Sequence, residues 1–393
     1  MRSLPFVVLP WLGLLACSVE SGGAGHDGDG TGGFSTGGET AGATGGSGPA
    51  DGGGAAVGTG GTGGTGGASD VGSGGVPGSG GAGDGAVTLE CGLPELTAPL
   101  GETSELLDVV AWAGKQGAIS YTLDDGTSSQ IQNYGALNAL GVPFTFYLVT
   151  NWGGAQDPIW QQALADGHEI GNHSHTHPQT GSGSDLDTAT AFIEMKWGVT
   201  PLTMAAPNGD NSYRPLASSR FLFNRGVGGG SIAPGGTTDR HNLPTYIPPT
   251  GANKATLDAG VSSAVSQGHW QTVTIHGFTG GAGGTDGAYQ PIPLDNFIAH
   301  VEGQRDGGLV WIGTLLDVGA YYIGKQLLDA AAAEVDGASS TWSWTLPDHF
   351  PAERCLRVRS SGRVSQGGVP IAKDPLGYYE IALDAGHVTV ATD

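Results

Sequence analysis

The chain has 393 residues, of which 74 are glycine, and its 37 acidic and 15 basic residues give a formal net charge of -22. Such an acidic chain repels phosphate backbones, so a nucleic-acid partner is not expected. Collagen is excluded because the glycines follow no three-residue period, and a disulfide-dense scaffold is excluded because there are only three cysteines.

The first 17 residues have the features of an export signal. One cation, Arg2, precedes an apolar run over Leu4–Ala16, which is too short to cross a bilayer but typical of a signal peptide. The run ends in Leu14-Leu15-Ala16-Cys17, which resembles the lipobox of bacterial lipoproteins. That resemblance implies a lipidated Cys17 and a protein exported to the bacterial cell envelope, in the outer membrane or at the cell surface. The alternative is an ordinary cleaved signal with a chance cysteine.

Residues 18–86 are rich in glycine, with serine, threonine, alanine and aspartate between the glycines. Such a segment has almost nothing to bury, so we expect it to be a disordered tether. A phosphate-binding glycine loop is excluded because the strand, lysine and helix that such a loop requires are missing. The lipid on Cys17 would then be the chain's one contact with a membrane.

Residues 87–328 read as alternating strands and helices. In chain order, strands are predicted at 118–123, 143–149, 169–172, 272–275 and 309–312, and helices at 131–140, 159–165, 188–197, 294–304 and 316–328. This alternation predicts an α/β fold with an inner parallel sheet or barrel. The chemistry of such folds lies at the carboxyl ends of the strands.

Residues 329–393 change to β-type alternation, with strands predicted at 341–346, 355–359, 378–383 and 387–391. We therefore expect a small β-sandwich-like accessory domain. Trp342 and Trp344 share one face of their strand. They could stack on sugar rings or pack against the preceding domain, and the pattern does not distinguish the two.

Three predicted strand ends carry reactive side chains. The first is Thr122-Leu123-Asp124-Asp125-Gly126, where one carboxylate could bind a metal while its neighbour accepts a proton. The second is His173-Ser174-His175-Thr176-His177, whose imidazoles could converge on one cation. The third is His276, which ends an apolar strand and could act as a general acid. Together they indicate metal-assisted hydrolysis.

These motifs resemble those of the polysaccharide deacetylase family, also called the NodB-homology domain or carbohydrate esterase family 4. Thr122–Gly126 is similar to its TFDDG motif, His173–His177 fits H(S/T)xxH, and Val273–His276 is similar to LxxH. The resemblance covers about residues 110–325. It implies a distorted (β/α) barrel with one divalent ion, zinc being the expected metal.

The resemblance also implies a role for each site residue. Asp125, His173 and His177 would hold the metal, and Asp124 would take the proton of the attacking water. His276 would protonate the departing amine, and the backbone N–H of Asn208 would help to hold the oxyanion.

Two departures from the family pattern stand out. The family's third motif usually begins with arginine, which positions the base, but Ala205 occupies that place. Asn208 or a distant arginine such as Arg214 would have to compensate, or the reaction would be slower. The family's fourth motif, an aspartate near a tryptophan that orients the histidine, is not recognisable.

The resulting hypothesis is a monomeric, metal-dependent hydrolase that removes N-acetyl groups from an acetylated polysaccharide. An O-acetyl esterase acting on a glycan would need the same residues. A catalytically inert carbohydrate-binding lipoprotein is the third alternative, supported mainly by Ala205.

The remaining cysteines, Cys91 and Cys355, are the two left once Cys17 is lipidated. Exported proteins meet oxidising conditions, so we expect these two to form a disulfide.

Overall fold

The computed structural model describes residues 85–284 and 286–392. The predicted signal sequence, Cys17 and the tether as far as residue 84 lie outside the described residues. None of the helices within the described part of the chain combines the length and the hydropathy needed to cross a membrane.

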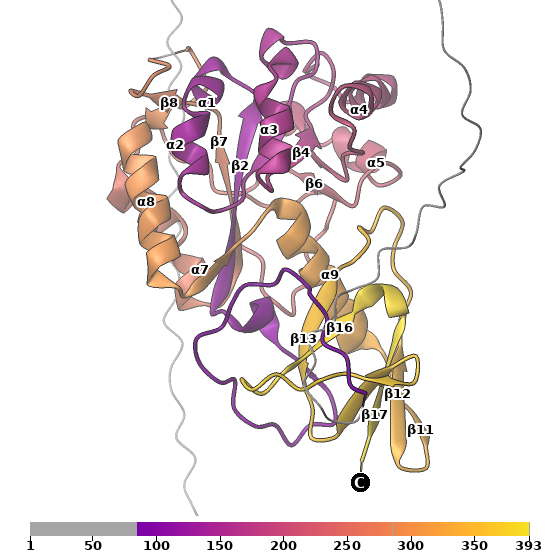
Figure 1. The fold of residues 1–393 in the computed structure, drawn as a ribbon. Coiled ribbons are helices and arrows are strands. Elements are labelled where there is room, and N and C mark those ends of the chain that lie inside the picture. The colour runs from indigo at the N-terminus through magenta and orange to yellow at the C-terminus, as the bar shows by residue number, and fades with distance from the viewer. Residues whose placement is uncertain (1–84, 285, 393) are drawn as a thin grey trace, which may run out of the picture. The chain divides into compact units, whose positions relative to one another are not determined.

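Parallel strands form the centre of the fold (Figure 1). The longest, β2 (Gly117–Asp125), pairs along one edge with β7 (Trp270–Ile275). Its other edge pairs with β10 (Val310–Ile312) near the start and with β3 (Thr145–Leu148) near the end. The order continues from β3 through β4 (Glu169–Asn172) and β5 (Thr203–Ala205) to β6 (Phe223–Arg225).

Two isolated bridges close this sheet into a distorted barrel. Leu243 bridges to Arg225 of β6, and Tyr246 bridges in parallel to Val273 of β7. The predicted distorted (β/α) barrel is therefore confirmed. All the reactive strand ends consequently lie at the same end of one barrel.

Helices surround the barrel on the outside (Figure 1). Their apolar faces and the outer face of the sheet share one large buried cluster that includes Phe144, Phe146 and Trp160. The helices are α1 (Ser128–Gln132), α2 (Tyr134–Asn138), α3 (Ile159–Ala165), α4 (Gly183–Trp197), α5 (Tyr213–Ala217), α6 (Lys254–Gly260), α7 (Ser262–Ser266), α8 (Leu294–Gly307) and α9 (Leu315–Ala330).

The single helix predicted over residues 131–140 is divided into α1 and α2 at Asn133. The backbone of Asn133 leaves the helical region, with φ -101° and ψ 7°. Its side-chain amide donates to the Ser129 carbonyl at 2.8 Å, and its Oδ1 accepts from the Ala282 N–H at 2.8 Å. This long-range contact attaches the loop after β8 (Phe278–Thr279) to the helix break, and periodicity does not reveal it.

The C-terminal region is all-β, as predicted. One antiparallel sheet has the order β1-β13-β16, and a second has the order β11-β12-β17-β14-β15. The strands are β1 (Asp108–Val109), β11 (Glu334–Asp336), β12 (Ser339–Ser343), β13 (Cys355–Arg359), β14 (Arg363–Gln366), β15 (Val369–Pro370), β16 (Tyr379–Ala382) and β17 (His387–Ala391).

Helix α9 joins the barrel to the C-terminal strands, because it contacts both β2 and β13 (Figure 1). Its buried side chains share one core with Leu356 and Val388 of the β region. Trp342 and Trp344 are half-buried and pack against this same core. The Trp344 indole also donates to the Leu383 carbonyl at 2.8 Å, so both tryptophans have a structural role.

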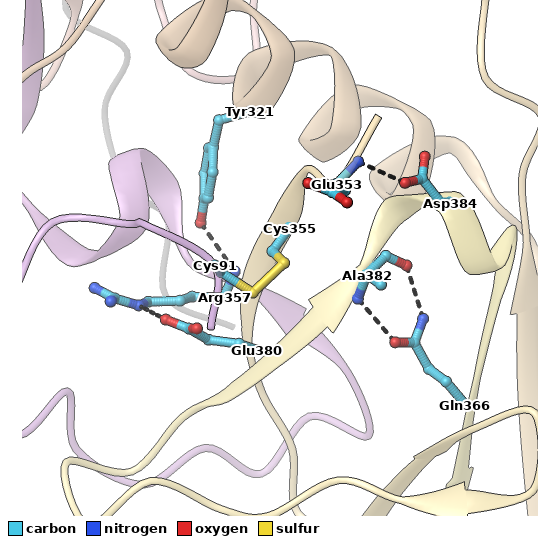
Figure 2. Close-up of a disulfide and its surroundings, with 9 residues drawn as sticks. All are labelled: Cys91, Tyr321, Glu353, Cys355, Arg357, Gln366, Glu380, Ala382 and Asp384. Carbon is cyan, nitrogen blue, oxygen red and sulfur yellow. Dashed lines mark hydrogen bonds and ion pairs between the residues drawn. A yellow bond between two sulfur atoms is a disulfide. The ribbon is translucent and has the colours of Figure 1, made fainter. Parts of the chain in front are cut away.

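A disulfide joins Cys91 to Cys355, the pair for which the sequence predicts a bridge (Figure 2). Beside it, the Arg357 guanidinium donates to Glu380 at 2.9 Å and to the Pro94 carbonyl at 2.6 Å. The disulfide and the buried Arg357 guanidinium thus both attach the segment before β1 to β13.

Removing this bridge should destabilise the protein measurably. It closes a loop across a sequence separation of 264 residues. The chain-entropy argument gives a loss on the order of 5 kcal/mol as an upper figure. The Cys91→Ser/Cys355→Ser variant should therefore melt several degrees below the wild type in a calorimetric scan.

Wild type treated with reductant is the matched control, and it should melt at the temperature of the variant. An unchanged melting temperature, with both thiols shown to be free by mass spectrometry, would contradict a stabilising role.

Candidate functional site

The carboxyl end of β2 places two adjacent carboxylates at the mouth of the barrel. Asp124 and Asp125 are buried, and Asp125 has a positive φ of 79°. This unusual conformation for a residue with a side chain turns the chain sharply into Gly126, whose φ is 64°. Both carboxylates consequently lie in the same cavity, although successive residues of a straight strand point to opposite faces.

The end of β4 provides the histidines. The loop that follows is held by its own polar side chains: Asn172 Oδ1 accepts from the Ser174 N–H, and Ser174 Oγ accepts from the His177 N–H. The Asp185 carboxylate, near the start of α4, accepts from the backbone N–H groups of His175 and Thr176 at 2.8 and 3.2 Å. These bonds form the tight turn that brings two imidazoles four residues apart to the same place.

Asp125, His173 and His177 form a cluster whose potential ligand atoms lie within 4.8 Å of one another. Asp125 Oδ1 is 3.5 Å from His173 Nε2 and 3.9 Å from His177 Nε2. Tetrahedral zinc with bonds of about 2.0–2.1 Å separates its ligands by about 3.4 Å, so the spacing fits. Asp125 Oδ1 is also buried without a hydrogen-bond partner among the described residues, as expected for a ligand atom.

The surroundings of His173 determine which ring nitrogen faces the cluster. Its Nδ1 lies 2.9 Å from the Ala205 carbonyl, which can only accept. Nδ1 therefore carries the proton, and Nε2 presents its lone pair to a metal. The third histidine of the motif, His175, is not part of the cluster, because its Nδ1 pairs with the Thr150 hydroxyl at 2.9 Å.

A buried arginine that the sequence analysis missed, Arg225, binds Asp124. Its Nη2 donates to Asp124 Oδ2, and both side chains are almost completely buried. Arg225 ends β6 and is the direct register partner of Ala205 on β5. A guanidinium thus reaches Asp124 from the strand beside the one that carries Ala205.

Arg225 corrects the expectation that Asn208 or Arg214 compensates for Ala205. Arg214 is half-exposed and pairs with Asp239 instead. One signal in the sequence could have identified Arg225: it comes soon after the apolar run Phe221-Leu222-Phe223, with only Asn224 between. A charge at that position needs a buried partner.

The end of β7 places His276 beside the carboxylates, with its Nε2 3.9 Å from Asp124 Oδ2. The buried Gln130 amide donates to the backbone carbonyls of both Asp124 and His276, at 2.6 and 2.9 Å. Gln130, which the sequence analysis did not single out, therefore ties together the two strand ends that carry these side chains.

The electrostatics of the site favour an ionised Asp124. Burial alone would raise the pKa of Asp124, but Arg225, His173 and His276 outweigh it and lower that pKa below its ordinary value. Burial also lowers the pKa of His276, against the opposing effect of Asp124. A carboxylate ready to accept a proton thus faces an imidazole whose protonated form is a stronger acid than usual.

These side chains line a cavity of 920 Å³ at the carboxyl end of the strands. Asn208 also lines it, with a positive φ of 56° in the turn after β5. The structure therefore brings together Asp124, Asp125, His173, His177, Asn208 and His276 in one cavity. Cys91 and Cys355 are bonded elsewhere, and Cys17 lies outside the described residues.

Residues 113–222 match the model of a protein family described as polysaccharide deacetylase. This range contains both carboxylates and both clustered histidines but ends before Arg225 and His276.

Two curated relatives are similar to parts of the chain. A gellan lyase from Bacillus sp is 24% identical over 310 residues, which are 70% of this chain and 12% of that protein. The protein YlxY from Bacillus subtilis (strain 168) is 40% identical over 74 residues, which are 17% of this chain and 23% of that protein. The chain thus spans less than a quarter of the length of either relative.

Several solved structures are similar to about half of the chain. A family 4 acetyl xylan esterase from Clostridium thermocellum, with a cobalt ion, is 18% identical, covering 51% of this chain and 89% of that chain at a TM-score of 0.38. Peptidoglycan deacetylase PdaC from Bacillus subtilis is 19% identical, with coverages of 53% and 91% and a TM-score of 0.36. A family 4 carbohydrate esterase from Streptomyces lividans is 21% identical, with coverages of 51% and 94% and a TM-score of 0.35.

Proposed function

Because this chain belongs to the polysaccharide deacetylase family through its NodB-type domain, we propose that it is a metal-dependent hydrolase that removes N-acetyl groups from a polysaccharide and releases acetate. The observation that carries the proposal is the Asp125–His173–His177 cluster, directly beside the buried Asp124–Arg225 pair. A merely carbohydrate-binding protein has no need for either arrangement.

Asp125, His173 and His177 would hold one divalent ion, and zinc suits their nitrogen and oxygen atoms. When bound, such an ion supplies Lewis acidity, which acidifies water and polarises the acetyl carbonyl. Three protein ligands leave a coordination position open, which is the arrangement of catalytic rather than structural zinc sites.

Asp124 is the general base in this proposal. Arg225 occupies its Oδ2, while its Oδ1 is buried without a hydrogen-bond partner among the described residues. Oδ1 is therefore the atom that takes the proton of the attacking water. Arg225 keeps the carboxylate both oriented and ionised in a buried place where it would otherwise become protonated.

His276 gives a proton to the departing nitrogen, so that an amine rather than an amide anion leaves. The Gln130 and Thr127 side chains both donate to its backbone carbonyl and hold it in place. The Asn208 backbone N–H, on the loop after β5, is the proposed donor to the oxyanion.

The main argument for an inert protein was the missing arginine at position 205. Arg225 removes that argument, because it brings a guanidinium to Asp124.

The test is acetate release from chitooligosaccharides, peptidoglycan and acetylated xylan, each with and without a chelator. We expect release from the N-acetylated glycans, loss of activity with chelator, and recovery on addition of Zn²⁺. Release from acetylated xylan alone would identify an O-acetyl esterase. Chelator-resistant release would contradict the metal-dependent mechanism.

The metal site makes a specific prediction about binding stoichiometry. The purified chain should bind about one zinc per molecule, and His173→Ala or His177→Ala should abolish binding because each removes one of three ligands. Metal content is measured by atomic emission after dialysis. His175→Ala is the matched control from the same loop, and it should retain zinc because His175 faces Thr150. Stoichiometric zinc in the double His173→Ala/His177→Ala variant would show that the ligands lie elsewhere.

We also propose that a lipid on Cys17 anchors the protein in the cell envelope. Cys17→Ser should then move the protein from the membrane fraction to the soluble fraction, since a polar glycine-rich segment has no affinity for lipid. Immunoblots of the two fractions measure this. Unchanged membrane association would refute the anchor without affecting the proposed chemistry.

A further inference from the structure

Two exposed aromatic side chains stand at the rim of the cavity. Over residues 85–284 and 286–392, the large hydrophobic side chains that remain exposed include Trp152, 40% exposed, and Tyr289, 60% exposed. Both line the 920 Å³ cavity, together with Val227, which is also exposed. Exposed hydrophobic side chains gathered at one cavity indicate a ligand surface, because folding alone does not account for them.

The two aromatic residues lie on opposite sides of the carboxylates. Trp152 follows β3, and Tyr289 lies beyond β7, between the short strands β8 (Phe278–Thr279) and β9 (Ile292–Pro293). Strands β3 and β7 pair with the two opposite edges of β2, which ends in Asp124 and Asp125. The Trp152 ring lies 5.5 Å from the His177 ring, and the Tyr289 ring lies 5.1 Å from the His276 ring. A substrate lying over both rings would therefore cross the reacting position.

Hydrogen bonds hold the backbone at or near each exposed ring. The backbone around Trp152 is bonded on both sides, from its own N–H to the Val149 carbonyl and from the Ala155 N–H to the Trp152 carbonyl. Near Tyr289, the Asp286 carboxylate accepts from the Ser129 N–H at 2.7 Å and from the Ala288 N–H at 3.2 Å. Exposed aromatic rings on a bonded backbone suit stacking on a flat ligand, since the backbone gains little order on binding.

A second cavity continues the binding surface away from the site. It measures 520 Å³ and shares Val227 and Ile247 with the first cavity. Ser231, Thr245 and Ser263 line it, and their hydroxyl groups pair with His269, Thr274 and Gln271 within the fold. The two adjoining cavities provide more surface than a single sugar needs.

The cavity offers no free cationic side chain to an acidic glycan. The one guanidinium among its lining residues, that of Arg225, is already bound to Asp124, and Asp125 is assigned to the metal. Asp286 adds a further carboxylate to the lining. Since the folded part of the chain is also acidic overall, a polyanionic chain would be repelled. The free amines that deacetylation leaves on a neutral glycan would instead be attracted.

We propose that Trp152 and Tyr289 stack on uncharged pyranose rings to either side of the sugar being deacetylated, so that the enzyme acts on internal residues of a neutral glycan. The inference rests on the proposed function for its reaction, but the binding surface is tested separately. An aromatic ring provides the apolar faces of a pyranose with a flat partner, and one ring on each side requires a chain rather than a single sugar.

The experiment uses the full chain and two probes, chitohexaose and N-acetylglucosamine. Binding is followed by tryptophan fluorescence and turnover by acetate release. Trp152→Ala and Tyr289→Ala should each weaken chitohexaose binding and raise its KM about five- to tenfold, the equivalent of one lost stacking contact. Both variants should lose more in turnover of chitohexaose than in turnover of N-acetylglucosamine, because a single sugar cannot contact both rings. Trp152→Phe should recover most of the binding, and zinc content should show that the neighbouring His177 still binds metal.

Met195→Ala is the matched control, because Met195 is 83% exposed on α4 and does not line the cavity. It should leave both probes unaffected. If both aromatic variants release acetate with an unchanged KM for chitohexaose, the inference is wrong and the proposed function stands. If the wild type binds chitohexaose through Trp152 and Tyr289 but releases no acetate, the inference stands and the proposed function fails. Equal affinity for the hexamer and the single sugar would overturn the two-sided surface.

Discussion

Replacing Asp124 with Asn should lower acetate release by about 10²–10⁴-fold, the usual contribution of a positioned general base. The amide keeps the shape of the side chain but cannot accept the proton of water at the position of Oδ1. Metal content and glycan binding should be retained, because Asp125, His173 and His177 are unchanged. The variant leaves the buried Arg225 without its partner, so thermal unfolding is measured in parallel and rates are compared per folded molecule.

Asp336→Asn on the exposed strand β11 is the matched control and should leave the rate unaffected. His276→Ala should also lower the rate, but less on an O-acetyl ester than on an N-acetyl substrate, because an alkoxide leaves more readily than an amide anion. Equal release by wild type and Asp124→Asn on every acetylated glycan would instead support the inert carbohydrate-binding alternative.

Removing Arg225 should have an effect of similar size, for a different reason. In Arg225→Ala, the burial of Asp124 is no longer opposed by a guanidinium, so the pKa of Asp124 rises from its lowered value. The base must be ionised to act, so the acidic limb of the pH–rate profile should move to higher pH. At neutral pH we expect activity to fall about 10²-fold, the lower end of a base's contribution.

Exchanging the two positions separates this role from simple packing. Ala205 and Arg225 are register partners on the adjacent strands β5 and β6. The Cα atoms of the two positions therefore lie at the same height along the barrel axis. The Ala205→Arg/Arg225→Ala variant should recover part of the activity that Arg225→Ala loses. Ala205→Arg alone should bring no gain, because Ala205 is fully buried and Asp124 already has its partner. Full activity of Arg225→Ala would show that Asp124 does not need the guanidinium.

The two C-terminal tryptophans show what a sequence pattern can and cannot predict. Their alternation predicted a strand, and β12 contains Trp342. The same pattern could not distinguish a sugar-stacking surface from a packing surface, because both place apolar rings on one face. In the structure they pack against the core shared with α9, whereas the exposed rings are Trp152 and Tyr289, which lie in loops without any periodic signal.

By itself, the sequence determined the α/β alternation, the reactive strand ends at Asp124, His173 and His276, and the all-β C-terminal region. These are local properties: a strand, the turn after it and a dense histidine motif are each encoded within a few consecutive residues. Only the tertiary structure decided which distant side chain binds Asp124. Arg225 is separated from it by 101 residues, and closure of the barrel brings the two together. Arg225 reaches Asp124 from β6 while its register partner on β5 is Ala205, and no pattern within a few consecutive residues encodes that choice.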